Sequence, residues 1–262
     1  MASLTFGYST LADRLGNIQL PNLKDHPDWD VLITVQSGTG IPPSVEQLSK
    51  CPSGERIKVM PFSGSGVTKL RNQVLTNAKG DYLLFADDDI TFDEEGILNA
   101  IEYMEDAQLA LLLGQAVDET GTLRKSYPTK PQRLNKLNSA KAATYEMLVN
   151  TKAVKLAGVS FDENFGAGAP ETYLGDEYIF IADLVSNGLN AYFVPITLAT
   201  HPTDSSGSGW GTPRDRKARA LIFDRVFQGN RTLPYLARVG FGLRKLGKGL
   251  SLKSFLLFVF KR

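Results

Sequence analysis

Five residues of an apolar run, Tyr82–Ala86, are followed directly by three consecutive aspartates, Asp87, Asp88 and Asp89. A short apolar run of this kind predicts a buried strand, and the aspartates mark the point where that strand leaves the core. Adjacent carboxylates disfavour each other's ionisation unless a cation neutralises them. Hard oxygen ligands select Mg²⁺ or Mn²⁺. Because open α/β sheets bind ligands at the carboxyl ends of their strands, we expect a metal site and a phosphorylated substrate here.

The rest of the chain predicts strands that alternate with helices, which is typical of a mostly parallel sheet flanked by helices. Strands are expected at residues 4–8, 30–36, 57–60, 82–86, 108–117, 143–150 and 191–201, and helices at residues 10–18, 68–78, 92–105, 151–157 and 175–187. Residues 118–141 carry six basic residues and two prolines, so we expect an exposed loop region there. The pattern therefore indicates an α/β protein.

Composition and charge narrow the classes of function. Hydrophobic residues make up 42% and charged residues 22% of the chain, as in an ordinary soluble globular protein. Cys51 is the one cysteine, which excludes a disulfide framework and suits a reducing compartment. The first residues carry neither a basic region nor a long apolar run, so we expect no signal peptide and a cytoplasmic location. The chain also has no apolar stretch long enough to span a bilayer.

The C-terminal segment differs in charge from the rest of the chain. Residues 231–262 hold eight basic and no acidic residues, so the remainder carries −7 against a total of +1. Large apolar side chains accompany the basic ones in residues 243–262, which suits contact with the inner face of a cell membrane. The alternative is a helix that docks on the core with a solvated basic face. We expect no nucleic-acid partner, because the aromatic residues are not interleaved with charges as in a stacking platform.

Four further patterns are candidates for chemistry, and each also has a structural interpretation. Gly64-Ser65-Gly66 before a helix could bind phosphate or form a simple turn. Asp176 and Glu177 open a predicted helix, where they could interact with its dipole or provide a general base. His201 after the last strand is either a structural histidine or a ligand. Residues 205–211, with Ser208 and Trp210, are either a lid over a substrate or a linker.

Several blocks resemble family 2 glycosyltransferases of the bacterial surface-polysaccharide type. These are residues 30–35, the Gly66-x-x-Lys-x-Arg71-Asn72 block and residues 78–89, in the order and spacing of that family. Residues 161–165 and 175–178 resemble its acceptor-side acidic motif. The resemblance covers about residues 4–205 and implies the GT-A (nucleotide-diphospho-sugar transferase) fold.

The resemblance also implies roles for individual residues. The Asp-x-Asp element, here Asp87 and Asp89, would hold Mg²⁺ or Mn²⁺ against the diphosphate of a nucleotide-sugar donor. On an extended strand end Asp87 and Asp89 share one side, so we expect Asp89 on the metal and Asp87 on the sugar or a metal-bound water. Glu177 corresponds to the catalytic base, but the order of the acidic pair is inverted, which leaves Asp176 as the alternative. His201 falls where relatives place a diphosphate or metal contact.

The predicted donor site draws on the ends of several strands. Gln36 and Ser37 stand where the family usually has aspartates that read the base, so the sequence does not fix a uracil or thymine donor. The full set of expected donor-binding residues is Tyr8, Ser9, Thr10, Gln36, Ser37, Lys69, Arg71, Asp87 and Asp88.

We therefore expect a metal-dependent, inverting glycosyltransferase of the hexosyltransferase type. Its acceptor would be a glycan or a polyprenyl-linked glycan in polysaccharide assembly. Residues 1–205 would form the catalytic domain, with a donor half (1–117) and an acceptor half (118–205), followed by a lid or connector (206–230) and the basic tail (231–262). One alternative is a sugar nucleotidyltransferase, although the glycine-rich loop expected after its first strand is absent here. The other is a non-catalytic carbohydrate-binding module.

Overall fold

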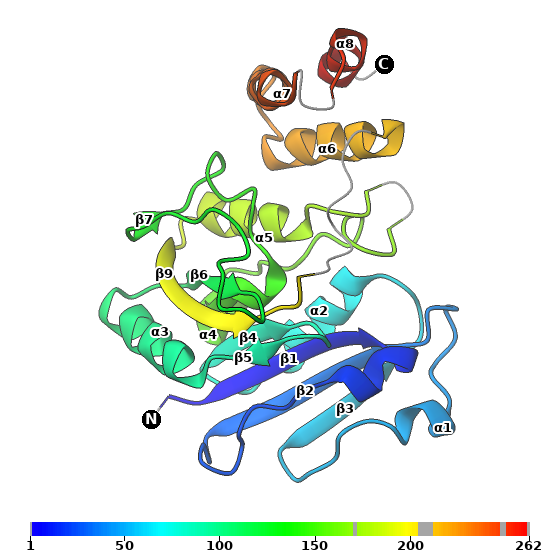
Figure 1. The fold of residues 1–262 in the computed structure, drawn as a ribbon, viewed down its shortest axis with the longest axis vertical. Helices are drawn as coiled ribbons and strands as arrows, with labels where there is room; N and C mark the ends of the chain where they lie inside the picture. The colour runs from blue at the N-terminus through cyan, green and yellow to red at the C-terminus, as the bar shows by residue number, and fades with distance from the viewer. Residues whose placement is uncertain (1, 170–171, 204–211, 247–249, 261–262) are drawn as a thin grey trace.

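The computed structural model describes residues 2–169, 172–203, 212–246 and 250–260 (Figure 1). A central sheet has the strand order β3-β2-β1-β4-β8-β6-β9-β5, and β7 pairs with β9. The strands are β1 (Leu4–Leu11), β2 (Trp29–Gln36), β3 (Ile57–Phe62), β4 (Tyr82–Ala86), β5 (Thr91–Phe92), β6 (Leu111–Val117), β7 (Gln132–Arg133), β8 (Met147–Asn150) and β9 (Ala191–Thr200). The helices are η1 (Ala12–Asn17), α1 (Val45–Leu48), α2 (Val67–Asn77), α3 (Glu94–Asp106), η2 (Thr144–Glu146), α4 (Thr151–Leu156), α5 (Asp176–Ser186), α6 (Pro213–Val226), α7 (Leu233–Lys245) and α8 (Leu252–Phe260).

The sheet is parallel on one side and mixed on the other. β3, β2, β1 and β4 run parallel, so their carboxyl ends meet at one edge. β8 is antiparallel to both β4 and β6, whereas β9 runs parallel to β6. This is the expected α/β arrangement, with the aspartates after β4 at the edge where ligands bind.

Side chains of β4 alternate between two apolar layers, as the two-residue period of a strand requires. Leu84 packs in the layer covered by α3, and Phe85 packs in the layer covered by α2, α4 and α5. Close approach of α2 depends on Gly7 in β1, because a Cβ there would lie 2.2 Å from Cγ1 of Val74. The packing of α2 against β1 in turn fixes the position of Arg71, one residue after the buried Leu70.

Several predicted boundaries were wrong at the ends of elements; among them, β3 extends to Phe62 and β6 begins only at Leu111. β1 continues to Leu11, and η1 replaces the helix predicted from residue 10. Phe92 belongs to the short strand β5, because Asp93 caps α3 by accepting a hydrogen bond from the Gly96 amide at 2.9 Å. β8 begins only at Met147, after the turn η2. Residues 118–141 form an extended connection whose regular structure is the two-residue strand β7.

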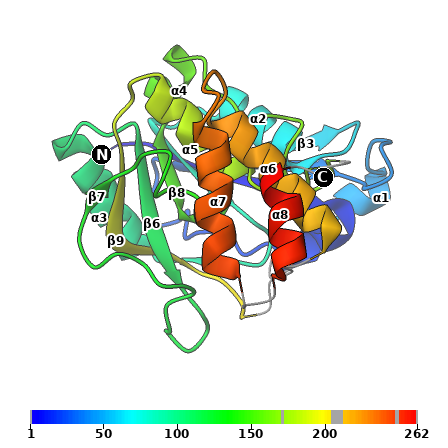
Figure 2. The same cartoon turned by 90° about the horizontal axis from the view of Figure 1, so that it is seen from above.

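The C-terminal helices form a layer above α5, seen at the top of Figure 1. α6 lies within the predicted connector, so residues 213–226 are helical rather than flexible; Thr212 and Asp215 form its capping box, with Pro213 in the first turn. α7 and α8 lie side by side over α6 (Figure 2). Among the described residues, no helix is both long enough and apolar enough to cross a membrane. The division of the chain into domains remains a prediction.

Candidate active site

The three aspartates after β4 contact different basic side chains. Asp87 Oδ1 lies 3.5 Å from Nη2 of Arg71. Asp88 is buried, accepts a hydrogen bond from the hydroxyl of Thr10, and pairs with Arg14 at 2.6 Å. Asp89 pairs with the same Arg14 guanidinium at 2.9 Å. The side chains of Asp87 and Asp89 therefore stay accessible at the edge of the sheet, whereas Asp88 points inward, as the sequence predicts.

Arg71 connects this cluster to the second predicted acidic motif. Its guanidinium is buried, pairs with Asp176, and has Nη1 3.3 Å from Oε1 of Glu177, besides its contact with Asp87. Burial alone would lower the pKa of Arg71, but the charges of Asp176, Glu177 and Asp87 raise it. A permanently charged side chain thus holds the donor-side and acceptor-side carboxylates in one site.

The two acidic residues at the start of α5 have different surroundings. The side chain of Asp176 is 5% exposed and that of Glu177 is 20% exposed. Burial, and then the charge of Glu177, raises the pKa of Asp176 above its usual value. Burial also opposes ionisation of Glu177, but Arg71 and a hydrogen bond from Thr144 Oγ1 (2.6 Å) hold its pKa below the usual value. The pair therefore contains one carboxyl that favours its proton and one that favours its charge.

Asp89 and His201 form a pair of side chains that fits a divalent cation. Nε2 of His201 lies 3.7 Å from Oδ1 of Asp89, and Nδ1 lies 2.7 Å from the carbonyl oxygen of Pro202. Because a carbonyl only accepts, we assign a proton to Nδ1, which in the neutral ring leaves the Nε2 lone pair directed at Asp89. Carbonyl groups commonly orient metal-binding histidines in this way.

The described ranges contain no group of three or more His, Cys, Asp or Glu side chains that could hold a metal ion. Mg²⁺ sites of phosphate-transfer enzymes commonly use one or two carboxylates together with substrate phosphates. The Asp89–His201 pair is consistent with such a shared site. Asp87 pairs with Arg71 instead, so its predicted part in metal binding remains a prediction.

Side chains of the predicted donor-binding segment in β1 are buried. Tyr8 is 0% exposed, packs in the core and donates its hydroxyl to the carbonyl of Gln19. Ser9 is buried next to Thr34. Both side chains face the packed layers of the sheet, and contact of Tyr8 and Ser9 with a donor remains a prediction. Thr10 is also buried and acts through Asp88.

Local hydrogen bonds occupy the polar groups at the end of β2 and before α2. The amide of Gly66 donates to Oε1 of Gln36 at 3.0 Å, and the amide of Val67 donates to the carbonyl of Ala167 at 2.9 Å. Ser37 donates its hydroxyl to the carbonyl of Ile41. These hydrogen bonds are those of a turn, and phosphate binding by the loop, like donor contact of Gln36 and Ser37, remains a prediction. Gly66 has a φ of 118° and lies against Gly168, which explains the absence of side chains there.

The predicted site residues not yet placed are Lys69, Ser208 and Trp210. Lys69 is half-buried in the first turn of α2, and its contact with a donor remains a prediction. Ser208 and Trp210, the predicted lid residues, lie outside the described residues.

Sequence reasoning missed three residues that complete the site. Arg14 on η1 pairs with both Asp88 and Asp89, and a basic side chain shortly after the first strand was the available signal. Thr144 donates to Glu177, and the ring of Tyr145 lies 4.7 Å from that of His201. No local pattern marks Thr144 or Tyr145, because their contacts depend on how the loop returns to the sheet.

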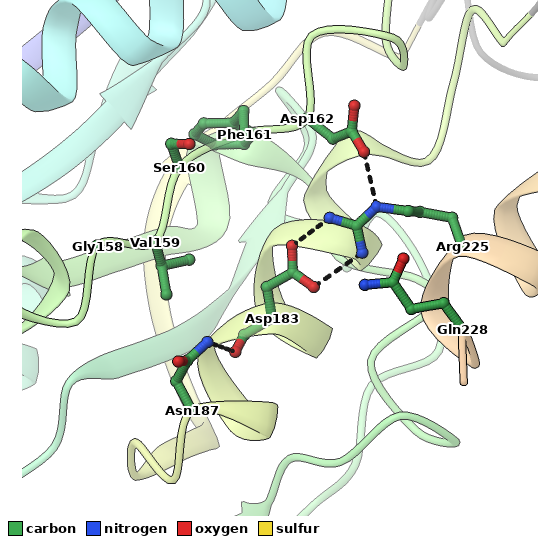
Figure 3. A pocket seen from close by; sticks show the side chains of 9 residues that line it. All are labelled: Gly158, Val159, Ser160, Phe161, Asp162, Asp183, Asn187, Arg225 and Gln228. Carbon is green, nitrogen blue, oxygen red and sulfur yellow. Dashed lines mark hydrogen bonds and ion pairs between the residues drawn. The ribbon is translucent and has the colours of Figure 1, made fainter. Parts of the chain in front are cut away.

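A separate cleft of about 450 Å³ lies between the loop of residues 158–162, α5 and the end of α6 (Figure 3). Arg225 spans it: Nε donates to Asp162 at 2.7 Å, and Nη1 and Nη2 donate to Asp183 at 3.0 and 2.7 Å. Phe161 and Asp162, from the first block of the predicted acceptor-side motif, line this cleft, but no residue predicted to bind the donor, the metal or the acceptor proton does. The ion pairs of Arg225 connect α6 to the body of the protein. We therefore take the site around Arg71, and not this cleft, as the candidate active site.

Comparison with known proteins agrees with this geometry. The family model described as Glycosyl transferase family 2 matches residues 17–162. No sequence among curated proteins matches the chain. Solved structures of S. aureus TarS have the same fold. The 1–349 form in complex with UDP-GlcNAc has a TM-score of 0.60 at 14% identity, with 99% of this chain and 82% of that chain covered.

The 1–349 form of TarS in complex with UDP has a TM-score of 0.58 at 15% identity, with 94% of this chain and 72% of that chain covered. A further TarS crystal structure also has a TM-score of 0.58 at 15% identity; its match covers 94% of this chain, but this chain spans only 43% of that one. At these identities the likeness shows the fold, which is the expected GT-A fold. The family model matches more than half of the residues of this chain, and the chain therefore belongs to glycosyl transferase family 2.

Proposed function

We propose that the protein transfers a sugar from a nucleotide-diphosphate donor to a hydroxyl group of an acceptor, with inversion at the sugar carbon. The observation that supports this most directly is the position of Arg71, which contacts Asp87 after β4 and Glu177 at the start of α5. A donor held at the first carboxylate would have its sugar close to the second. A single displacement needs one base and no protein nucleophile, which agrees with the residues present.

Glu177 is a better candidate than Asp176 for the base that removes the acceptor proton. Its side chain is more exposed, and Arg71 with Thr144 favours its charged form, which is the form that accepts a proton. Asp176 is almost fully buried and favours its protonated form. We assign Asp176 the role of holding Arg71 in place.

Asp89 and His201 would hold Mn²⁺ or Mg²⁺ in this proposal, given their separation of 3.7 Å. When bound, the cation would neutralise charge on the departing diphosphate as a Lewis acid. Asp87 then remains with Arg71, where its carboxylate can accept a hydrogen bond from a sugar hydroxyl. The TarS structures in complex with UDP-GlcNAc and UDP favour a UDP-sugar as the donor.

A panel of UDP-, dTDP- and GDP-sugars, scored by release of nucleoside diphosphate with and without Mn²⁺, tests the activity. Glu177→Gln should reduce transfer at least about 100-fold and leave UDP binding within about twofold. Glu102→Gln, at an exposed position on α3, is the matched control and should behave as the wild type. Absence of nucleoside diphosphate release with every donor, or full transfer by Glu177→Gln, would refute the proposal.

We further propose that α7 and α8 bring the enzyme to an acceptor at an anionic membrane surface, such as a lipid-linked glycan. Exposed apolar side chains line both helices; on α8 they are Leu252, Leu256 and Phe260, at 64%, 46% and 57% exposure. Residues 231–262 add eight basic and no acidic residues. Burial of apolar side chains together with attraction of Lys and Arg to anionic lipids binds helices of this kind at the bilayer interface.

Co-sedimentation with liposomes separates membrane binding from simple packing of the tail. We expect binding to vesicles that contain about 30% phosphatidylglycerol, an anionic lipid, and weak binding to neutral vesicles. The variant Leu252→Ser/Leu256→Ser should lose binding, whereas Leu156→Ser, at 78% exposure on α4, should retain it. Equal binding of all variants, or none by the wild type, would contradict the membrane contact.

A further inference from the structure

Arg14 pairs with one carboxylate oxygen of Asp89, Oδ2, while the other, Oδ1, faces His201 and the proposed cation site. We infer that Arg14 acts as an internal counter-ion that holds Asp89 in the ligand-free protein and competes there with the divalent cation. The inference rests on the proposed function, because it concerns the same metal site. It goes beyond that function by explaining how the site remains stable before any ligand binds, and why three aspartates are present.

A single nitrogen of Arg14 serves two carboxylates. Nη2 lies 2.6 Å from Oδ1 of Asp88 and 2.9 Å from Oδ2 of Asp89. The other oxygen of Asp89, Oδ1, is the one that faces His201. A cation bound between Asp89 and His201 would therefore lie close to the guanidinium, and two positive centres would share one carboxylate.

The two partners of Arg14 differ in how strongly they hold it. The side chain of Asp88 is 5% exposed, and its Oδ1 has no hydrogen bond besides the ion pair with Arg14. A buried carboxylate oxygen without this charge would be costly, so Arg14 stays with Asp88. Asp89 is 32% exposed and Arg14 is 45% exposed, so their contact is accessible to solvent and weak. The cation can therefore displace Arg14 from Asp89 but not from Asp88.

This arrangement gives Asp88 a function distinct from that of its neighbours. Thr10 and the core fix Asp88, Asp88 retains Arg14, and Arg14 neutralises Asp89 until a cation replaces it. The apparent affinity of the free enzyme for the cation is reduced by this competition. A donor diphosphate, which adds negative charge beside Asp89, would shift the balance toward the cation.

Direct Mn²⁺ binding, followed by electron paramagnetic resonance of the free ion without nucleotide, tests the inference. Arg14→Gln should bind Mn²⁺ about fivefold more tightly than the wild type, the effect expected when a half-exposed ion pair is removed. Adding Asp89→Asn to Arg14→Gln should abolish this gain. Arg133→Gln on β7 removes an equal charge from a position paired with Tyr192, at the opposite end of β9 from His201, and should bind as the wild type.

The double variant Arg14→Gln/Asp88→Asn separates competition from net charge and avoids an unpaired buried carboxylate. Its net charge equals that of the wild type, so tighter Mn²⁺ binding in this variant supports displacement of Arg14. If the wild type binds Mn²⁺ and releases nucleoside diphosphate but both folded variants bind Mn²⁺ no more tightly than the wild type, the inference is overturned and the proposed function stands. If the wild type neither binds Mn²⁺ nor releases nucleoside diphosphate, both this inference and the proposed function fail.

Discussion

At the scale of single residues, Arg71 carries the charge balance of the candidate site. It is 6% exposed and is in contact with Asp87, Asp176 and Glu177. A methionine of similar length at this position would leave the carboxylates of Asp87 and Glu177 without their cation and Asp176 without its hydrogen-bond donor. Removal of one partner from a buried ion pair costs about 3–5 kcal/mol. We therefore expect Arg71→Met to lower the free energy of unfolding in urea by that amount.

Arg71→Lys separates charge from geometry in the same experiment. It should recover most of the stability but not the transfer activity, because an ammonium cannot reach two carboxylates with a planar fork. Wild-type stability of Arg71→Met would show that the guanidinium does not neutralise the cluster.

Asp176 predicts a specific dependence of stability on pH. Burial raises its pKa in the folded protein above the unfolded value of about 3.9. A raised folded-state pKa gives stability that is fully present below the unfolded pKa and is lost as pH rises through the folded pKa. Between pH 5 and pH 8 we therefore expect the Tm of the wild type to fall more than that of Asp176→Asn. Each kcal/mol of unfolding free energy lost by the wild type should lower its Tm by about 2–4 °C. Differential scanning fluorimetry across this range measures it, and parallel curves for the two proteins would contradict the shift.

At the scale of secondary structure, the loop before β8 positions the proposed base. Glu146 at the end of η2 is fully buried and accepts hydrogen bonds from Lys125 (2.8 Å) and Tyr127 (2.6 Å). These contacts hold η2 in the orientation in which Thr144 donates to Glu177. The buried contacts of Glu146 thus position the hydroxyl group of Thr144.

Removing that hydroxyl should affect the base and leave the fold intact. We expect Thr144→Val to lower kcat about tenfold with little change in the donor KM, because the donor does not contact this residue in the proposed arrangement. The acidic limb of the pH–rate profile should move to higher pH, since one of the interactions that favour the charged form of Glu177 is lost. Thr144→Ser should restore both, and a Thr144→Val enzyme with wild-type kcat and pH profile would exclude a positioning role.

The sequence predicted elements best where local signals were complete. β4 was found with both boundaries because an apolar run is limited by Gly80 and by Asp87. Phe92 was assigned to a helix because its apolar side chain fits the helical period. In the structure it belongs to the two-residue strand β5, which pairs with β9. The contacts of Arg71 with Glu177, and of Arg14 with Asp89, join residues distant in the chain, so neither composition nor spacing could predict them.

At the scale of the whole molecule, the C-terminal helices form a layer on α5. Ile222 and Val226 of α6 pack against Ile179 of α5, and α7 and α8 pack in turn on α6. The proposed membrane surface is therefore connected to the helix that begins with Asp176 and Glu177. Docking of α7 and α8 on a bilayer would hold the opening of the site at a fixed distance from lipid-linked acceptors.

Arg225 makes a polar connection between this layer and the body of the protein. Its three hydrogen bonds to Asp162 and Asp183 tie the end of α6 to α5 and to the loop that follows α4 (Figure 3). Burial of the pair is partial, so we expect Arg225→Ala to cost only about 1–2 kcal/mol of unfolding free energy. Hydrogen exchange should rise in α6, α7 and α8 and stay unchanged in β1, β2 and β4, because the loss is local. Arg225→Lys should give an intermediate result, and an equal rise of exchange throughout the sheet would show that the C-terminal helices are not a separable layer.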